Sequence, residues 1–365
     1  MRGARATASA LVWAAALATG ACGDPLLVLG DVPGTMRLVA GVPDSAGTAV
    51  GATPLESLLG GPRGLAADAE GTVFVASHDT RMVQRFRAGE AFEVIADVGT
   101  CAGSLCIERP TAVLPDGLGA LYISDRAHHA VFRLSPGTGT LELIAGDGSQ
   151  GVSPDGVTAA GSPLAVPAGL ALDPSGRLYI AESGSGRVRR VESDGTLRTV
   201  AGSGVRGSGG DGGPATAASL GSPSGLALHA GVLYIADALE HRVRAVDLAS
   251  GVIETLAGSG TDGFGGDGGP ARDAALRAPA ALTVALDGRT LFIADTENHR
   301  VRRVNLSTGV ITTFAGTGDT AFNGDLMEAG GTSLSQPRGV AATEAGQLYI
   351  ADTGHHVVWR TTIER

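Results

Sequence analysis

The sequence predicts an all-β protein, a six-bladed β-propeller in which every blade is a sheet of four strands. Three observations predict this fold. A unit of four short apolar segments recurs six times, turn residues separate the segments, and the two chain ends supply complementary parts of one unit. Four strands per repeat, packed blade against blade around an axis, are typical of propellers.

The first strand of each unit begins with the pattern Pro-x-Gly/Ala-Leu/Val. The pattern starts at Pro62, Pro110, Pro167, Pro223, Pro279 and Pro337, so that successive copies lie 48, 57, 56, 56 and 58 residues apart. We expect this strand to be the innermost of its blade, beside the central channel.

The other three strands follow in a fixed order. The second is the Leu-Tyr-Ile-Ala-Asp type of segment, found at 72–77, 121–125, 178–182, 233–237, 291–295 and 348–352. The third is basic and β-branched, clearest at 187–191, 242–246 and 300–304, and the fourth ends in Ala-Gly, at 196–202, 252–258 and 310–316. Short runs rich in Val, Ile and Tyr, bounded by Gly and Asp, indicate β-strands.

The two ends of the chain predict ring closure. The sixth unit stops after its third strand, whereas residues 36–41 match the fourth-strand pattern and precede the first complete unit. Pairing of 36–41 with 357–363 completes the last blade and leaves no exposed sheet edge there. We expect one domain over residues 36–365, and a monomer.

The repeated residues resemble a known family. The segment Ile293-Ala-Asp-Thr-Glu-Asn-His-Arg-Val-Arg302 resembles the NHL repeat, and the linker Gly-Asp-Gly-Gly-Pro-Ala at 210–215 and 266–271 is similar to that of bacterial extracytoplasmic NHL proteins. This resemblance implies the six-bladed fold but not one function, because a single propeller fold serves many unrelated functions.

The first residues predict export. Arg2 and Arg5 precede the apolar run 6–18, which is too short to span a bilayer as a helix. Small residues then lead to Cys22, which resembles the cleavage site of bacterial lipoproteins. The alternative is ordinary cleavage nearby, which leaves Cys22 as a free or lost thiol.

These features divide the chain into a signal peptide over 1–21, a tether over 22–35 that carries lipid on Cys22, and the propeller.

The two remaining cysteines, Cys101 and Cys106, enclose a short loop. In an oxidising compartment such a pair is expected to form a disulfide. The alternative, a metal or redox site, lacks further Cys and a nearby His with ligand spacing.

The composition excludes several function classes. The formal net charge is −10, and all 27 basic residues are Arg. Chemistry that depends on Lys, such as Schiff-base formation, is excluded, and nucleic acid is not an expected partner because phosphate binding needs a basic face. Aromatic residues make up 4% of the chain, which argues against a deep hydrophobic pocket.

The residues that recur in every blade are interpreted as structural. Strands lie ~4.8 Å apart, so a turn between the second and third strands is on the order of 10–15 Å from the axis. Histidines at such turns cannot share one zinc ion, whose ligand nitrogens lie at about 2.1 Å. The recurring side chains are His129, His241, His299 and His356, together with the strand-ending Asp125, Asp237, Asp295 and Asp352, which Ser77 and Glu182 replace in two blades.

The Gly-rich linkers offer a calcium alternative. Asp211, Asp262 and Asp267 lie in these linkers, but each linker has only one or two carboxylates, whereas Ca²⁺ takes 6–8 oxygen ligands. We therefore expect structural loops, each followed by a short helical turn after Pro214 or Pro270. No cofactor is expected, with Ca²⁺ and Zn²⁺ as the alternatives, and no catalytic or metal-binding residue is assigned.

The second position of Pro-x-Gly supplies the candidate ligand-binding residues. It reads Arg63, Thr111, Ala168, Ser224, Ala280 and Arg338. Blades 6 and 1 are neighbours in the ring, so Arg63 and Arg338 place two guanidinium groups at the channel mouth. Two such groups can bind a carboxylate or phosphate; the alternative is that both pair with local acids.

The sequence therefore predicts an exported, lipid-anchored binding module of the cell envelope, periplasmic or at the cell surface, whose lipid is its only contact with the membrane. Its expected partner is an envelope protein, a peptide or a glycan, on the face that holds the second-to-third-strand turns and the Gly-Asp-Gly-Gly-Pro linkers. One alternative is a metal-dependent lyase or lactonase, which the resemblance raises. Another is an architectural part of an envelope assembly.

Overall fold

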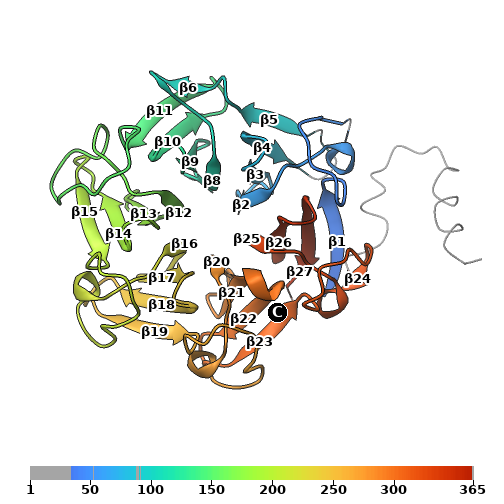
Figure 1. Cartoon of the computed structure of the whole chain (residues 1–365). Helices are drawn as coiled ribbons and strands as arrows, with labels where there is room; N and C mark the ends of the chain where they lie inside the picture. Colours follow the sequence, from blue (N-terminus) through green and yellow to red (C-terminus); the bar gives the residue numbers. More distant parts are fainter. Residues whose placement is uncertain (1–33, 52, 88–89, 91, 364–365) are drawn as a thin grey trace, which may run out of the picture. The chain divides into compact units, whose positions relative to one another are not determined.

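Six antiparallel blades surround a central axis in the computed structural model, which describes residues 34–363 except 52, 88, 89 and 91 (Figure 1). Blades 1 to 5 run from the innermost strand outward in chain order, and the sixth is completed by strands from elsewhere in the chain. This arrangement confirms the predicted all-β, six-bladed propeller, and the order of strands within each blade is the order of the four sequence segments.

The strand bounds match the repeated segments. Blade 1 holds β2 (Pro62–Ala67), β3 (Val73–Ser77), β4 (Met82–Phe86) and β5 (Glu93–Ala96), and blade 2 holds β8 (Pro110–Pro115), β9 (Leu121–Asp125), β10 (Ala130–Ser135) and β11 (Thr140–Ala145). Blade 3 holds β12 (Pro167–Leu172), β13 (Leu178–Glu182), β14 (Arg187–Val191) and β15 (Leu197–Ala201). Blade 4 holds β16 (Pro223–His229), β17 (Val232–Asp237), β18 (Arg242–Asp247) and β19 (Ile253–Ala257). Blade 5 holds β20 (Pro279–Val284), β21 (Thr290–Asp295), β22 (Arg300–Asn305) and β23 (Ile311–Ala315).

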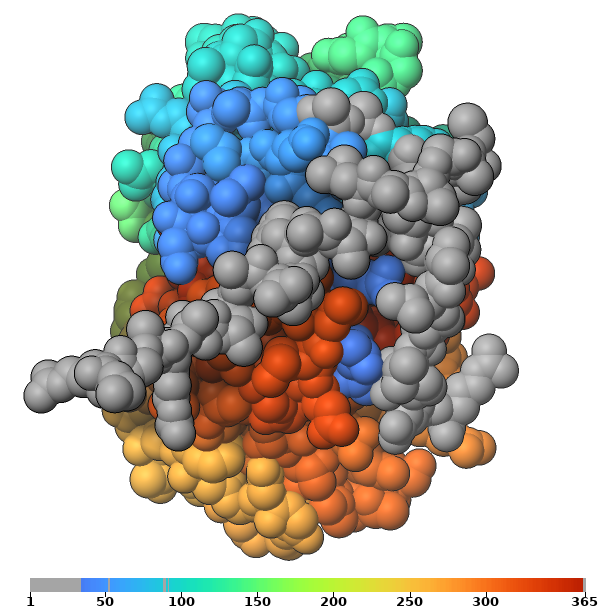
Figure 2. Space-filling view, turned by 90° about the vertical axis from the view of Figure 1, so that its right-hand side faces the viewer, coloured from blue at the N-terminus to red at the C-terminus, as the bar shows by residue number. Residues whose placement is uncertain are grey.

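The sixth blade contains both ends of the propeller. Its strands are β25 (Pro337–Ala342), β26 (Gln347–Asp352), β27 (Val357–Thr362), β1 (Thr35–Ala40) and the short β24 (Met327–Glu328). β1 pairs antiparallel with β27, with Leu38 opposite Trp359, which confirms the predicted closure. Figure 2 shows the N-terminal residues, in blue, set among those of the last blade, in red. β24, on the outer side of β1, was not predicted from the sequence.

The remaining elements are short. A two-stranded hairpin precedes blade 2, and 3-10 turns lie in the connections; they are β6 (Cys101–Ala102), β7 (Leu105–Cys106), η1 (Pro54–Glu56), η2 (Ala215–Ala217), η3 (Ala271–Asp273), η4 (Thr296–Asn298) and η5 (Ala329–Gly331). η2 and η3 are the helical turns predicted after Pro214 and Pro270, although each proline precedes the turn and caps it.

The hydrophobic core is divided among the blade interfaces. Six clusters of buried side chains each join two neighbouring blades, as where Phe74 of blade 1 packs with Ile123 of blade 2. Since each blade covers the apolar face of the next, a single blade buries too little apolar surface to be stable alone.

The glycine of Pro-x-Gly allows neighbouring inner strands to touch. A Cβ on Gly339 would lie 2.3 Å from the carbonyl oxygen of Arg63, and one on Gly225 would lie 2.5 Å from that of Ala280. These distances are far below van der Waals contact, so the inner strands meet backbone to backbone where they begin. We call this side of the ring, where the inner strands begin, the top face, and the opposite side the bottom face.

The linkers pair with the start of the outer strand of the following blade, and they also touch the second-to-third-strand turns, as where the Asn298 side chain donates to the Gly263 carbonyl at 2.7 Å. Thr158 bridges Thr196, Pro214 bridges Val252 and Pro270 bridges Val310, each partner lying beside the start of an outer strand. The linkers are visible outside the ring in Figure 1. Because they cover otherwise open sheet edges, they protect the blades from pairing with other chains.

Candidate functional site

At the second position of Pro-x-Gly, on the top face, only blades 6 and 1 carry arginine. Arg63 lies on β2 and Arg338 on β25, two inner strands that contact each other, and both side chains are partly buried. The structure thus brings the two predicted arginines to adjacent strands.

Further charged groups join this side of the mouth. The charges of Arg126 and Arg109 in blade 2 act on Arg63 together with that of Arg338, while Asp79 opposes them. The sequence analysis missed Arg109 and Arg126, although both flank its landmarks: Arg109 precedes Pro110, and Arg126 follows Asp125. We call Arg63, Arg109, Arg126 and Arg338 the arginine cluster.

Nearby acidic groups balance the charge of Arg63 only in part. Burial, followed by the repulsion of Arg338 and Arg126, lowers the pKa of Arg63 to about 10. Its Nε is buried and has no hydrogen-bond partner. A partly desolvated guanidinium with an unused donor, surrounded by like charges, is suited to bind an anion.

Arg338 has a weak acidic partner. One of its terminal nitrogens lies 3.7 Å from a carboxylate oxygen of Glu297. Burial lowers the pKa of Arg338, and the charge of Glu297 opposes that shift. The alternative of local pairing therefore describes Arg338 in part, but no ion pair of Arg63 is found among the residues that the structure describes.

His78 lies beside the cluster and stays neutral. Burial, and next the charge of Arg63, lowers the pKa of His78 to about 4. Its Nδ1 is buried without a hydrogen-bond partner. A neutral imidazole adds no further positive charge near pH 7, and it leaves one more polar atom unsatisfied at the mouth.

The equivalent inner-strand positions of blades 3, 4 and 5 carry small, uncharged residues. Ala168, Ser224 and Ala280 occupy the equivalent positions of blades 3, 4 and 5, and the Ser224 hydroxyl donates to the carbonyl of Pro279 at 2.9 Å. The mouth can therefore hold an anionic group on the side of blades 6, 1 and 2. In the described part of the chain, no three His, Cys, Asp or Glu side chains are grouped so as to hold a metal ion.

The repeated histidines connect neighbouring blades. The Nδ1 atom of each accepts a hydrogen bond from the backbone N–H that precedes the next inner strand: His129 from Val166, His241 from Ala278, His299 from Gln336 and His356 from Gly61, at 3.1–3.2 Å. All four have positive φ, between 46° and 60°. Their turn geometry and bonds are structural.

The repeated aspartates hold the same region from within each blade. Asp125 accepts the backbone N–H groups of Glu108 and Arg109 at 2.6 and 2.8 Å, so it positions a member of the arginine cluster. Asp237, Asp295 and Asp352 accept equivalent bonds, and Glu182 accepts one from Ala165. Ser77 instead donates to Gln84.

The linker aspartates bind arginines. Asp211 lies 2.6 Å from Arg244, and Asp267 lies 2.6 Å from Arg302; both arginine side chains are fully buried. Asp262 lies 2.9 Å from Arg277. Since guanidinium groups already neutralise these carboxylates, their arrangement is that of structural loops.

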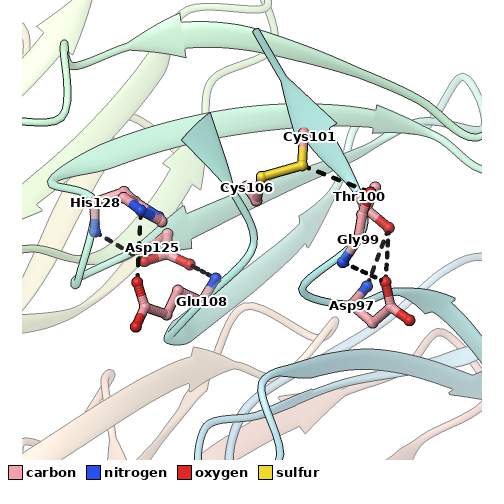
Figure 3. Close-up of a disulfide and its surroundings, with 8 residues drawn as sticks. All are labelled: Asp97, Gly99, Thr100, Cys101, Cys106, Glu108, Asp125 and His128. Carbon is pink, nitrogen blue, oxygen red and sulfur yellow. Dashed lines mark hydrogen bonds and ion pairs between the residues drawn. A yellow bond between two sulfur atoms is a disulfide. The ribbon is translucent and has the colours of Figure 1, made fainter. Parts of the chain in front are cut away.

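Cys101 and Cys106 form a disulfide across the β6–β7 hairpin (Figure 3). The bridge lies between two turns that hydrogen bonds fix: Asp97 accepts the N–H of Gly99, and Asp125 accepts that of Glu108. The disulfide thus fixes the chain that leads to Arg109. Cys22 lies outside the described residues.

The bottom face contains a large, open cavity. It has a volume of about 980 Å³ and is lined where the inner strands end. Its lining combines apolar residues, such as Leu172, Leu228 and Val284, with charged ones, such as Glu70 and Arg87.

Comparisons with known proteins agree with the repeat assignment. The Teneurin NHL domain model matches residues 43–209, and the NHL repeat model matches residues 334–360. NHL repeat-containing protein 2 of Homo sapiens is 28% identical over 270 residues, which are 65% of this chain and 37% of that protein. The chain spans 23 to 37% of the length of the curated relatives first matched.

Solved structures share the fold. A protein of unknown function from Bacteroides thetaiotaomicron has a TM-score of 0.69 and 19% identity, over 90% of this chain and 76% of that one. An inactive virginiamycin B lyase from Staphylococcus aureus has a TM-score of 0.52 and 14% identity, over 83% and 95% of the two chains. At these identities the likeness shows the fold alone.

Within residues 34–363, no helix is long and apolar enough to cross a membrane.

Proposed function

We propose that this chain, an NHL-repeat six-bladed β-propeller, is an exported binding module that captures an anionic group of an envelope protein, peptide or glycan at the mouth of its channel. NHL-repeat propellers support a binding or interaction role. The finer proposal depends on the arginine cluster, in which arginines of three adjacent blades lie near enough for their charges to act on Arg63.

Arg63 is the observation that carries this proposal. Its guanidinium is partly desolvated, its neighbours repel it, and its Nε donor is unused. A bound carboxylate or phosphate relieves the repulsion and satisfies the donor. Folding has already desolvated Arg63 and brought the like charges together, so anion binding does not have to supply that free energy. The overall charge of −10 opposes non-specific anion binding, which favours a ligand that this local cluster recognises.

A titration with charged and neutral probes tests the proposal. We expect the purified protein to bind hexaglutamate in low salt, and hexaserine at least tenfold more weakly. The double variant Arg63→Gln with Arg338→Gln should weaken hexaglutamate binding by tenfold or more, because charge-assisted hydrogen bonds contribute about 1.5–3 kcal/mol each. Isothermal titration calorimetry measures both affinities.

The matched control is Arg272→Gln, which removes an exposed arginine from an outer linker. It should leave hexaglutamate affinity unchanged. Equal affinities of the double variant and the unmodified protein, or of the two peptides, would refute the site.

The cellular part of the proposal concerns residues outside the described range. The signal-like segment 1–21 and Cys22 support export and a lipid anchor. In a bacterial host, labelled palmitate should be incorporated into the full chain and not into Cys22→Ala. Equal labelling, or none, would contradict the anchor.

A further inference from the structure

The bottom-face cavity lies at the other end of the channel from the arginine cluster. One residue of each inner strand lines it at the same position, five places after the first proline: Ala67, Pro115, Leu172, Leu228, Val284 and Ala342. Its volume of about 980 Å³ lies at the upper end of the range of small-molecule pockets. All six residues are apolar, while charged side chains and backbone polar groups also line the cavity; we call this part of the channel the funnel.

The funnel is unequal around the axis. Blades 3, 4 and 5 contribute Leu172, Leu228 and Val284 and no acidic or arginine side chain, whereas every acidic or arginine residue that lines the cavity comes from blade 1 or blade 6. The side of blades 3 to 5 is therefore the less polar one. An apolar body therefore fits against blades 3 to 5.

Two exposed leucines lie at the opening of the cavity, one in blade 2 and one in blade 5. Leu118 is 89% exposed and Leu286 is 56% exposed, both in turns that line the cavity. They add exposed apolar surface at two points of the opening.

Carboxylates stand on the side of blades 1 and 6. Asp68 and Glu70 of blade 1 and Glu344 of blade 6 line the cavity, and both glutamates are exposed. None of the three has an ion-pair partner in the described part of the chain. Asp68 accepts the N–H of Thr72 at 2.7 Å, while the glutamates have no such bond.

The arginine side chains that line the cavity already have hydrogen-bond or ion-pair partners. Arg85 is 2.8 Å from Glu93, and Arg87 donates to the Thr72 hydroxyl at 2.8 Å and lies 3.9 Å from Glu90. Arg87 keeps one buried donor, Nε, without a partner, which makes an anionic head group the competing ligand. The unpaired charges of the rim are negative, so charge complementarity favours a cation.

We propose that this cavity binds a small amphipathic cation, with its apolar body against Leu172, Leu228 and Val284 and its ammonium group beside Glu70 and Glu344. The site is independent of the arginine cluster, since it faces the opposite side of the ring and prefers the opposite charge. Failure of either proposal leaves the other intact.

Three probes with one tail and different head groups test the charge preference. Dodecylammonium, dodecanol and dodecanoate are titrated below the concentrations at which they form micelles. We expect dodecylammonium to bind more tightly than dodecanol, and dodecanoate to bind most weakly. Shortening the ammonium probe to decyl and octyl should weaken binding about fourfold per methylene, as expected when the tail leaves water.

Variants separate the two parts of the site. Glu70→Gln with Glu344→Gln should weaken dodecylammonium binding about tenfold and leave dodecanol binding unchanged. Leu228→Gln should weaken both, and its thermal unfolding shows whether the propeller stays folded. Glu142→Gln, an exposed glutamate on β11 outside the cavity, is the matched control and should change neither affinity.

Several outcomes would overturn the proposal. Dodecanoate binding as tightly as dodecylammonium would assign the cavity to anions and to Arg87. An unchanged affinity in the Glu70 and Glu344 double variant would remove the ammonium site. Absence of binding by all three probes would show that the funnel is an unused feature of the fold.

Discussion

His78 is a single residue whose environment opposes its own protonation. Its side chain is only 7% exposed, and burial followed by the charge of Arg63 lowers its pKa from 6.5 to about 4. Between these two pH values the His78 imidazole is protonated in the unfolded chain but stays neutral in the folded chain. Acid therefore destabilises the fold through this residue, and its contribution to stability is lost as the pH falls from about 6.5 to about 4.

Replacing His78 with Gln should flatten this part of the pH profile. When the unfolded chain binds one proton more than the folded chain, the free energy of unfolding changes by up to about 1.4 kcal/mol per pH unit. We expect urea denaturation at a series of pH values to show a smaller loss of stability in His78→Gln than in the unmodified protein between pH 6.5 and 4. Since all other titrating groups are common to both proteins, parallel curves would contradict the shifted pKa.

At the scale of elements, a buried arginine fastens each of three linkers to the blade that follows. Arg189, Arg244 and Arg302 occupy the same position of β14, β18 and β22, with fully buried side chains, and bind Asp155, Asp211 and Asp267. Threonines of the adjacent outer strands bind the same carboxylates, as Thr313 binds Asp267. Blade 6 differs: Trp359 takes this position and donates to Asp352.

Removing one such arginine should be costly. Arg244→Ala leaves Asp211 without its buried partner and opens a space under the linker, so we expect a loss of about 3–5 kcal/mol of stability. Arg272 contacts the same carboxylate at 3.1 Å from the surface, where its side chain is 54% exposed. Arg272→Ala should therefore cost less than about 1 kcal/mol. Chemical denaturation compares the two variants, and equal losses would show that burial does not decide the cost.

At the scale of the whole molecule, β1 joins the two ends of the ring. Met36 and Ala40 of this strand are fully buried, and Met36 belongs to the cluster that includes Trp359. Without β1, the edge of β27 becomes free to pair with other chains, and the last blade loses part of its core.

Two truncations test this closure. A chain that begins at residue 34 keeps β1 and should remain monomeric, with cooperative unfolding. A chain that begins at residue 43 lacks β1 and should form oligomers or aggregates, with a lower and broader thermal transition. Size-exclusion chromatography and thermal scans compare the two. A monomeric shorter chain that unfolds like the longer one would show that closure is dispensable.

The sequence by itself determined the repeat number, the strand order, the closure by β1 and the cysteine pair. These features depend on patterns that are local in the chain: an alternation of apolar residues predicts a strand, and a fixed period predicts a ring. Arg63 and Arg338 were found in the same way, because a repeat makes an unusual residue at a fixed position conspicuous.

Only the tertiary structure decided what lies between blades. Arg109 and Arg126 join Arg63 from another blade, the linkers contact both the outer strands and the second-to-third-strand turns, and a funnel opens on the bottom face. Each of these depends on how far one blade is rotated and tilted from the next, across about fifty residues of chain. That geometry is set by the packing of many side chains at six interfaces, and no single segment of the sequence encodes it.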